Sequence, residues 1–472
     1  MKAWAFWLVG VFALVAPGTF GAAEPPTVVS RAEDGQELAL TVYNVGRALV
    51  RDARRVLLPA GVVKLEFRDI AAQVMPQTVA LVSPDVVVLE QNYEYDLLSP
   101  RTLLAKFLGR EVILVREEPR LDGPGTVRQE VRATLLALNE GTVWRVGDRI
   151  VSNPTYRELV FDQVPPNLRD RPTLVWLIDV ARAGARGVQA TYLTQGLTWR
   201  ADYVLSLDQR GSRGNLTGWV TLSNTSGASY PEARLQLVAG EVHLAPERRP
   251  PEPALRTMEL KKAAGMEEEP LGEYHLYTLP RPTTILDRQD KQVTLLAAQG
   301  VEVTQRLVVA GKPHWYWGRQ QDVQRESVEL RLQLANREAN NLGVPLPAGV
   351  VRVYQQDARG SEQFMGEDSI PHTPKDELVT LTLGNAFDLV AERVQTDFRS
   401  FDRVTESAFE VRLRNRKKGP VTIEVEEHID GDWEMLAHSH PYTKRSAFVV
   451  VFTVPVPGEG QTTVSYRVRV RR

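Results

Sequence analysis

Residues 328–334 read Val-Glu-Leu-Arg-Leu-Gln-Leu, so apolar and polar side chains alternate without a break. Strict alternation of this kind is typical of a β-strand that has one face on a core and the other in water. The same alternation occurs at residues 409–414 and 464–470. Because it recurs along most of the chain, with turn residues between the runs, the sequence predicts a mainly β fold of several antiparallel β-sandwich-like modules.

Helical segments are few and short in this pattern. The best lies at residues 100–108, where Ser99 can cap the free N–H groups, Pro100 suits the first position and Gly109 ends the helix. Short strands follow this helix along the chain. Together they predict a small barrel-like insert over residues 97–165.

Composition suggests where the other modules begin and end. A stretch rich in Pro, Glu, Arg and Lys is too poor in apolar residues to fold alone and is typical of a linker. The final stretch has the size of an immunoglobulin or fibronectin type III sandwich. The predicted divisions are a leader at 1–23, an N-terminal β region at 24–96, the insert at 97–165, a β region at 166–245, a linker at 246–273, a β-sandwich region at 274–394 and an immunoglobulin- or fibronectin-like module at 395–472.

The first 23 residues have the pattern of a cleavable secretory signal peptide. Lys2 precedes an almost unbroken apolar run from Ala3 to Ala16, and the small residues 21–23 come before Glu24. The run is shorter than the ~20 residues that span a bilayer comfortably. The alternative is a retained anchor helix. We expect a periplasmic or secreted protein with no transmembrane span in the mature chain.

Composition also excludes several kinds of chemistry. The 472 residues include no cysteine, which rules out disulfides, thiol nucleophiles and thiolate metal sites. A formal net charge of -2 provides no field that would attract nucleic acid, so no nucleic-acid partner is expected. The sequence motifs of zinc proteases, α/β-hydrolases, phosphate-binding loops and dinucleotide sites do not occur. No cofactor is expected, and neither the ligand nor the oligomeric state follows from the sequence.

Two regions of the chain carry motifs of a known family. The first joins residues 197–203, 218–227 and 230–235, and includes Leu-Thr-Trp-Arg and Gly-Trp-Val-Thr-Leu-Ser-Asn-Thr-Ser-Gly. The second contains Leu-Pro-Ala-Gly, Phe-Met-Gly-Glu-Asp, His-Thr-Pro and Leu-Gly-Asn-Ala-Phe-Asp between residues 346 and 388. In order and spacing these resemble the bacterial family called domain of unknown function 4139, whose relatives include proteins labelled mucoidy inhibitor A. The resemblance covers residues 190 to the C-terminus. It implies a β fold and no established activity, and the coiled coil usual in those relatives is not predicted here.

The most site-like cluster of polar residues is Glu367, Asp368 and His372. Carboxylates and an imidazole close in sequence can act as acid and base, or hold a metal with a third ligand, so these three are the candidate catalytic residues. The alternative is a tight turn at residues 366–368 whose side chains satisfy the backbone groups of a loop.

A second candidate is a metal site. His438 and His440 flank one residue, so on a strand both rings would project from the same face. Such a pair can hold zinc or copper if Glu426, Glu427 or His428 supplies further ligands. The alternative is a pair of solvated histidines.

A third candidate is the aromatic run Trp315, Tyr316 and Trp317. Exposed rings could stack on the faces of sugars, whereas buried rings would belong to the core. Trp199 and Tyr203 lie four residues apart on a predicted strand, which indicates core positions on one face.

The sequence as a whole predicts an exported, non-enzymatic β-module protein of the cell envelope that binds a protein or glycan partner. The alternative is a hydrolase or metal-dependent enzyme centred on Glu367, Asp368 and His372.

Overall fold

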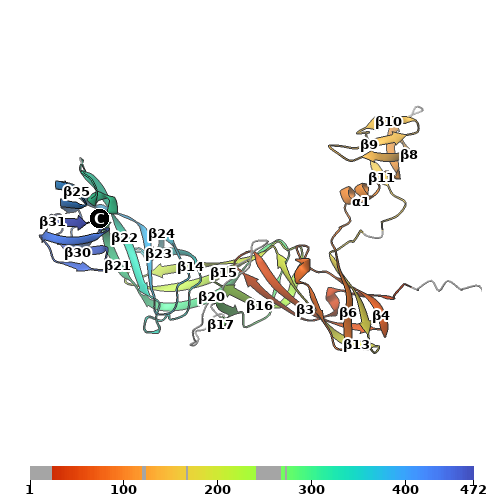
Figure 1. Cartoon of the computed structure of the whole chain (residues 1–472), viewed down its shortest axis with the longest axis horizontal. Coiled ribbons are helices and arrows are strands. Elements are labelled where there is room, and N and C mark those ends of the chain that lie inside the picture. Colours follow the sequence, from red (N-terminus) through yellow and green to blue (C-terminus); the bar gives the residue numbers. More distant parts are fainter. Residues whose placement is uncertain are drawn as a thin grey trace, which may run out of the picture. The chain divides into compact units, whose positions relative to one another are not determined.

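The computed structural model describes residues 24–119, 124–165, 168–240, 267–271, 274–320 and 322–471. Strands make up 65% of the structure, which confirms the prediction of a mainly β fold. Within this described part α1 (Pro100–Lys106) is the one α-helix, and Figure 1 shows it among the labelled strands. The described ranges also contain four 3₁₀ turns: η1 (Ala32–Asp34), η2 (Pro76–Thr78), η3 (Pro313–Tyr316) and η4 (Glu338–Asn340).

The chain divides into two compact units. The first holds residues up to 36, 53–70 and 80–190, and the second holds 37–52, 71–79 and 191 onward. The predicted signal peptide at 1–23 lies outside the described residues, as does most of the predicted linker at 246–273. No helix within the described ranges has both the length and the apolar character to cross a bilayer.

The core of the first unit is built on a four-stranded sheet. Its central strand β12 reads Thr-Leu-Val-Trp-Leu-Ile-Asp-Val, a nearly continuous apolar run that suits a strand covered on both faces. Trp176 packs edge-to-face against Phe67 at 5.8 Å between ring centroids. The first unit also holds Ala53–Leu58 of β3 (Arg47–Leu58), β5 (Ala80–Val82) and the first part of β13 (Gly184–Gln195). The sheet runs in the order β1 (Thr27–Ser30), β4 (Gly61–Arg68), β12 (Thr173–Val180) and β6 (Val86–Glu94).

A buried carboxylate lies on this sheet. Glu66 in β4 is 5% exposed, and it accepts from Arg68 at 2.7 Å and from Arg169 at 3.0 Å. Burial acts to raise the pKa of Glu66, but hydrogen bonds and charge from the two arginines outweigh it, so the pKa lies below its ordinary value.

The insert at residues 97–165, predicted to be barrel-like, is instead an open antiparallel sheet beside α1. Its own core contains Leu104 from the helix, Phe107 directly after it, and Leu114, Leu135 and Trp144 from the strands. The strand order is β10 (Arg149–Ser152), β9 (Val143–Val146), β8 (Thr126–Ala137), β7 (Glu111–Pro119) and β11 (Glu158–Val160).

The start of α1 is capped as the sequence predicts. The Ser99 hydroxyl accepts from the Thr102 N–H at 3.1 Å, and the Thr102 hydroxyl accepts from the Ser99 N–H at 2.9 Å. The helix ends at Lys106, two residues before the predicted end, and Gly109 follows with a φ of 75°. A glycine suits that left-handed position because it has no Cβ.

The second unit contains three groups of paired strands. In the first group β16 (Tyr230–Ala239) pairs in parallel with β2 (Gly35–Tyr43), and antiparallel with β18 (Tyr274–Thr278) and β19 (Thr283–Ile285). Strand β17 (Glu267–Leu271), inside the predicted linker, pairs with β18.

The second group is a five-stranded sheet in which β14 and β23 are parallel and the other pairs antiparallel. Trp199 and Tyr203 lie on its inner face with 4% and 0% exposure, so the predicted core positions are confirmed. The parallel pair joins segments about 150 residues apart, which local alternation could not reveal. The order is β20 (Gln289–Glu302), β15 (Arg213–Asn224), β14 (Leu197–Leu207), β23 (Gly349–Gln356) and β24 (Glu362–Ile370).

The third group is a nine-stranded sheet whose strands share one hydrophobic core. Phe452 of β30 and Phe409 of β26 both stack on Tyr466 of β31, at 5.4 and 5.5 Å. The alternating run at 328–334 lies in β22, where Val328, Leu332 and Leu334 are buried. The order is β28 (Asp432–His438), β31 (Gln461–Arg471), β26 (Val404–Asn415), β25 (Leu378–Phe401), β22 (Gln324–Ala335), β21 (Thr304–Ala310), β27 (Val421–His428), β30 (Val449–Val456) and β29 (Tyr442–Lys444).

Candidate functional site

The candidate catalytic residues lie at the edge of the five-stranded sheet, and their polar atoms are engaged in structural contacts. Glu367 pairs with Arg352 at 3.1 Å. Asp368 accepts the backbone N–H groups of Ser369 at 2.8 Å and Thr382 at 2.7 Å. Glu367 and Asp368 are consecutive on a strand, so their side chains point to opposite faces.

His372 follows the strand, and its Nδ1 accepts the N–H of Ala348 at 3.2 Å. Residues 366–368 belong to β24 itself and do not form the tight turn that was the alternative. Gly366 adopts a φ of 139° beside an irregularity in the pairing of β24 with β23.

Glu367 is the end of a row of polar side chains that crosses all five strands. Gln292 donates to the Thr221 hydroxyl at 3.3 Å, and this hydroxyl donates to Asp202 at 3.0 Å. Arg352 then bridges Asp202 at 3.1 Å and Glu367 at 3.1 Å. We call these five residues the polar ladder. Each strand contributes one member, from β20 through β15, β14 and β23 to β24, and Figure 1 shows these strands side by side.

Three aromatic rings lie on the same face of the sheet as the ladder. Trp219 is two residues from Thr221 on β15 and is 36% exposed. Tyr354 is two residues from Arg352 on β23, and its ring packs against Phe364, which is 56% exposed, at 5.5 Å between centroids. We call the polar ladder together with these three rings the ladder face.

The ladder face is close to electrically neutral. Arg200 lies 3.3 Å from Asp202, so two arginines balance the carboxylates of Asp202 and Glu367. Amide and charged groups thus lie beside ring surface on one side of a sheet, and the buried Thr221 hydroxyl links them. Such a surface can donate and accept hydrogen bonds and can stack on flat apolar faces, which are the requirements for binding a sugar chain.

Trp219 was not among the candidate residues, although the sequence contains a signal for its exposure. On β15 Val220 and Leu222 point to the buried face, so Trp219 shares its face with Thr217 and Thr221. An aromatic ring in the polar register of an alternating strand indicates exposure. The pairing of Tyr354 with Phe364 depends on β23 meeting β24, and no local pattern reveals it.

The predicted sugar-binding run lies in the core instead. Trp315 is 4% exposed and Tyr316 0%, and Trp317 packs against the same core of the nine-stranded sheet. The buried rings offer no surface on which a sugar could stack. They belong to the 3₁₀ turn η3, which lies against β26 and carries Trp315 over Arg393 at 4.5 Å.

Arg393 is the centre of a buried polar cluster that the sequence did not predict. Its Nε donates to Glu326 at 2.7 Å, and its Nη1 donates to Glu427 at 2.5 Å and to the Tyr466 hydroxyl at 3.0 Å. The Tyr316 hydroxyl donates to Glu427 at 2.8 Å. We call these five residues the Arg393 cluster.

The phenols of the Arg393 cluster stay protonated. Burial, followed by the nearby Glu427 carboxylate, raises the pKa of Tyr316 and of Tyr466 well above the ordinary value. Burial also raises the pKa of Glu326, although the charge of Arg393 opposes the shift. The cluster is enclosed by the core and therefore acts in packing, since no ligand can reach it without opening the sheet.

The candidate metal ligands are dispersed. His438 ends β28, with its Nδ1 2.9 Å from the backbone oxygen of His440, while the His440 Nδ1 lies 2.8 Å from the Ser439 hydroxyl. Glu427 belongs to the Arg393 cluster, and His428 lies 3.8 Å from Glu426. Within the described residues no group of three or more His, Asp or Glu side chains is placed to hold a metal ion.

No protein-family model matches this chain. No curated protein matches it either. The resemblance to the family of domain of unknown function 4139 therefore stays a prediction.

Proposed function

We propose that this is an exported, non-enzymatic protein of the cell envelope that binds a glycan through the ladder face. The observation that carries the proposal is the exposure of Trp219 and Phe364 beside a hydrogen-bonded row of polar groups on one sheet face. Rings stack on the apolar faces of sugars, while carboxylates, amides and hydroxyls bond to sugar hydroxyls.

The spacing of the rings favours a chain of sugars as the ligand. Trp219 lies opposite Asp202, and Tyr354 lies beside Ser206, which is four residues further along β14. From the strand separation and the rise per residue, the two backbone positions are about 16 Å apart. A single sugar cannot reach both rings, whereas an oligosaccharide lying diagonally across the sheet can.

A protein partner is the weaker candidate for this face. Protein interfaces have an apolar centre from which charged residues are depleted. On the ladder face the ion pairs of Arg352 lie between the rings, so the centre of the surface is polar. A neutral, hydroxyl-rich ligand suits this arrangement better.

The contacts of the candidate catalytic residues support a binding role over the alternative of a hydrolase. Asp368 has both oxygens on backbone N–H groups, and Glu367 is paired with a guanidinium. A general acid or base must reach the proton that it transfers, and these carboxylate oxygens already bond to groups of the protein. Export remains part of the proposal and is supported by the leader pattern at residues 1–23.

The test is binding of neutral hexose and N-acetylhexosamine oligosaccharides to the purified protein, measured by calorimetry. Trp219→Ala and Phe364→Ala each remove one ring, and we expect each to cost about 1.5 kcal/mol, which is roughly tenfold in Kd. Phe448→Ala is the matched control, because this ring is 51% exposed and belongs to a loop away from the ladder.

Two outcomes would reject the proposal. In the first, Kd is unchanged in the Trp219 and Phe364 variants, or changes equally in the Phe448 variant. In the second, the protein releases reducing ends from the oligosaccharides and loses this activity in Glu367→Gln and His372→Ala. The second result would establish the hydrolase.

A further inference from the structure

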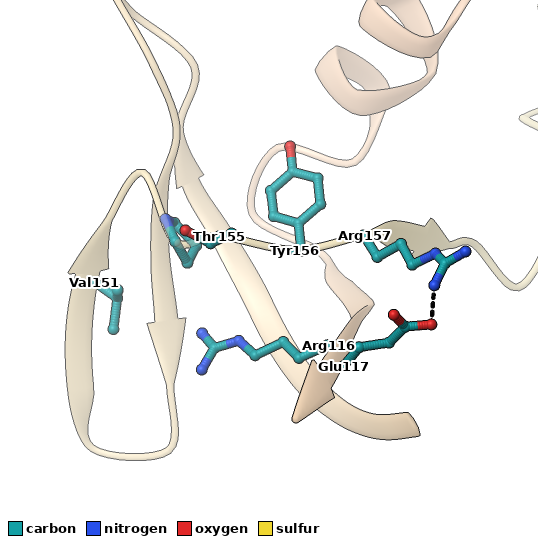
Figure 2. Close-up of a pocket in the computed structure, with 7 residues that line it drawn as sticks. Arg116, Glu117, Val151, Thr155, Tyr156 and Arg157 are labelled. Atoms are coloured by element: carbon teal, nitrogen blue, oxygen red, sulfur yellow. Dashed lines mark hydrogen bonds and ion pairs between the residues drawn. The ribbon is translucent and has the colours of Figure 1, made fainter. Parts of the chain in front are cut away.

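The insert carries a hollow of about 540 Å³ that is separate from the ladder face. It is lined by Arg116 and Glu117 of β7, Val151 of β10 and the segment from Pro154 to Arg157. Figure 2 shows Arg116 reaching toward Val151 and Thr155, while Glu117 extends the other way and is joined to Arg157. The hollow therefore contains one cation engaged with a carboxylate and one that is not.

Arg116 occupies an unusual position for a charged residue. It continues the row of Val112 and Leu114, which point into the core of the insert, because residues two apart on a strand share a face. Its Nε is buried and has no hydrogen-bond partner. Among the residues that the structure describes, its guanidinium also makes no ion pair. A buried donor without a partner destabilises the protein, and a ligand that supplies an acceptor removes this cost.

The other charged groups of the hollow are already paired. Arg157 donates to Glu117, so this pair adds no net charge. Glu130 and Glu158, from the strands on either side of β7, both lie near Arg128, at 3.3 and 3.5 Å. Among the lining residues this leaves one net positive charge, on the guanidinium of Arg116. Arg128, Glu130 and Glu158 do not line the hollow, and together they carry one net negative charge beside it.

The chemistry of this fork selects the ligand. A guanidinium binds a carboxylate through two parallel hydrogen bonds. One positive charge neutralises one carboxylate completely, whereas a phosphate dianion would keep a negative charge beside Glu117. The hollow is larger than a carboxylate needs. Val151 and Pro154 offer apolar surface to a ring, and the Thr155 hydroxyl can bond to a ring hydroxyl.

We propose that the hollow of the insert binds an acidic sugar, whose carboxylate pairs with Arg116 and whose ring lies against Val151 and Pro154. This is a second site, with a ligand different from that of the ladder face. The hollow and the ladder face have no residue in common, so the failure of one proposal leaves the other standing.

The test is titration of the full protein with an oligosaccharide of galacturonate, followed by calorimetry at two salt concentrations. Arg116→Met keeps the apolar stem and removes the fork, and it should raise Kd at least tenfold. Arg116→Lys keeps the charge without the fork and should give an intermediate Kd. Glu117→Gln releases Arg157 from its pair, so it should lower Kd several-fold.

The control is Arg132→Met, because Arg132 is an exposed cation of the same insert, paired with Glu111 at 2.9 Å and not part of the lining. Its Kd should equal that of the unchanged protein. Far-UV circular dichroism shows whether each variant folds, and the Lys and Gln variants, which make small changes, keep the test decisive if the Met variant unfolds.

Three further probes define what would overturn the assignment. The methyl ester of the same oligosaccharide lacks the charge, and equal binding of it would show that Arg116 does not select the ligand. If inorganic phosphate bound more tightly than the galacturonate oligosaccharide, the hollow would be a phosphate site and not a carboxylate site. Binding of a short peptide through its free C-terminal carboxylate, without binding of galacturonate, would assign the hollow to a peptide.

Discussion

Replacing Arg393 by Met should destabilise the second unit more than any change of a surface arginine. The side chain is 1% exposed and makes four hydrogen bonds, two of them to Glu326, one to Glu427 and one to Tyr466. Methionine fills much of the same volume, so the loss is mainly electrostatic. Removing one partner of a buried ion pair leaves the other charge uncompensated and costs about 3–5 kcal/mol.

The assay is thermal unfolding, followed by intrinsic fluorescence and circular dichroism. A loss of 3–5 kcal/mol lowers the Tm of a unit of this size on the order of 10 °C. The matched control is Arg412→Met, an exposed arginine on the adjacent strand β26, which should change Tm little. The double variant Arg393→Met with Glu427→Gln removes one of the two carboxylates that lose their partner, and it should recover part of the loss. Equal Tm values for the Arg393 and Arg412 variants would refute the reasoning.

Three other predictions concern separate parts of the chain. The pKa of Glu66 is lowered in the folded state, so its stabilising effect is complete above the ordinary value of 4.5 and disappears as the pH falls through the lower folded value. When Tm is measured between pH 3 and 6, the Tm of Glu66→Gln should therefore fall less steeply with decreasing pH than that of the unchanged protein. Ser99→Ala removes the cap of α1 and should cost the insert about 1 kcal/mol, with faster amide exchange over residues 100–106 and a smaller loss in Ser99→Gly. Gly366→Ala would place a Cβ 2.5 Å from the Leu383 oxygen at a φ of 139°, so it should lower Tm more than Gly360→Ala, where φ is 82° and the space is open.

The sequence predicted the parts of the fold that depend on neighbouring residues. Alternation predicted β22, β26 and β31, and Ser99 with Pro100 predicted α1. A strand face and a helix cap are each determined by a few consecutive residues. The local sequence does not determine which strands pair. Nothing within β14 indicates that β23 will lie beside it, so the row from Gln292 to Glu367 could not be foreseen.

The surroundings of the candidate site residues depend in the same way on strand partners. The composition of residues 315–317 shows large rings but not whether they face the core, and that depends on Arg393 and Tyr466, which come much later in the chain. His438 and His440 are close in sequence, but neither ring turns toward a further ligand within the described residues. Glu367 was selected as an acid or base, and it lies on the ladder face because it is directly opposite Arg352.

The ion pair between Arg352 and Asp202 also has a consequence for how the chain finds its structure. A shift of β23 by one residue against β14 would turn Arg352 toward the apolar interior and move Val351 into water. The misaligned sheet would bury an unneutralised guanidinium, so the charged pair distinguishes the correct alignment from its nearest competitors. Strands β14 and β23 are about 150 residues apart in the sequence, and their backbone hydrogen bonds alone would allow a pairing shifted by one residue. The contact between Arg352 and Asp202 disfavours that shifted pairing.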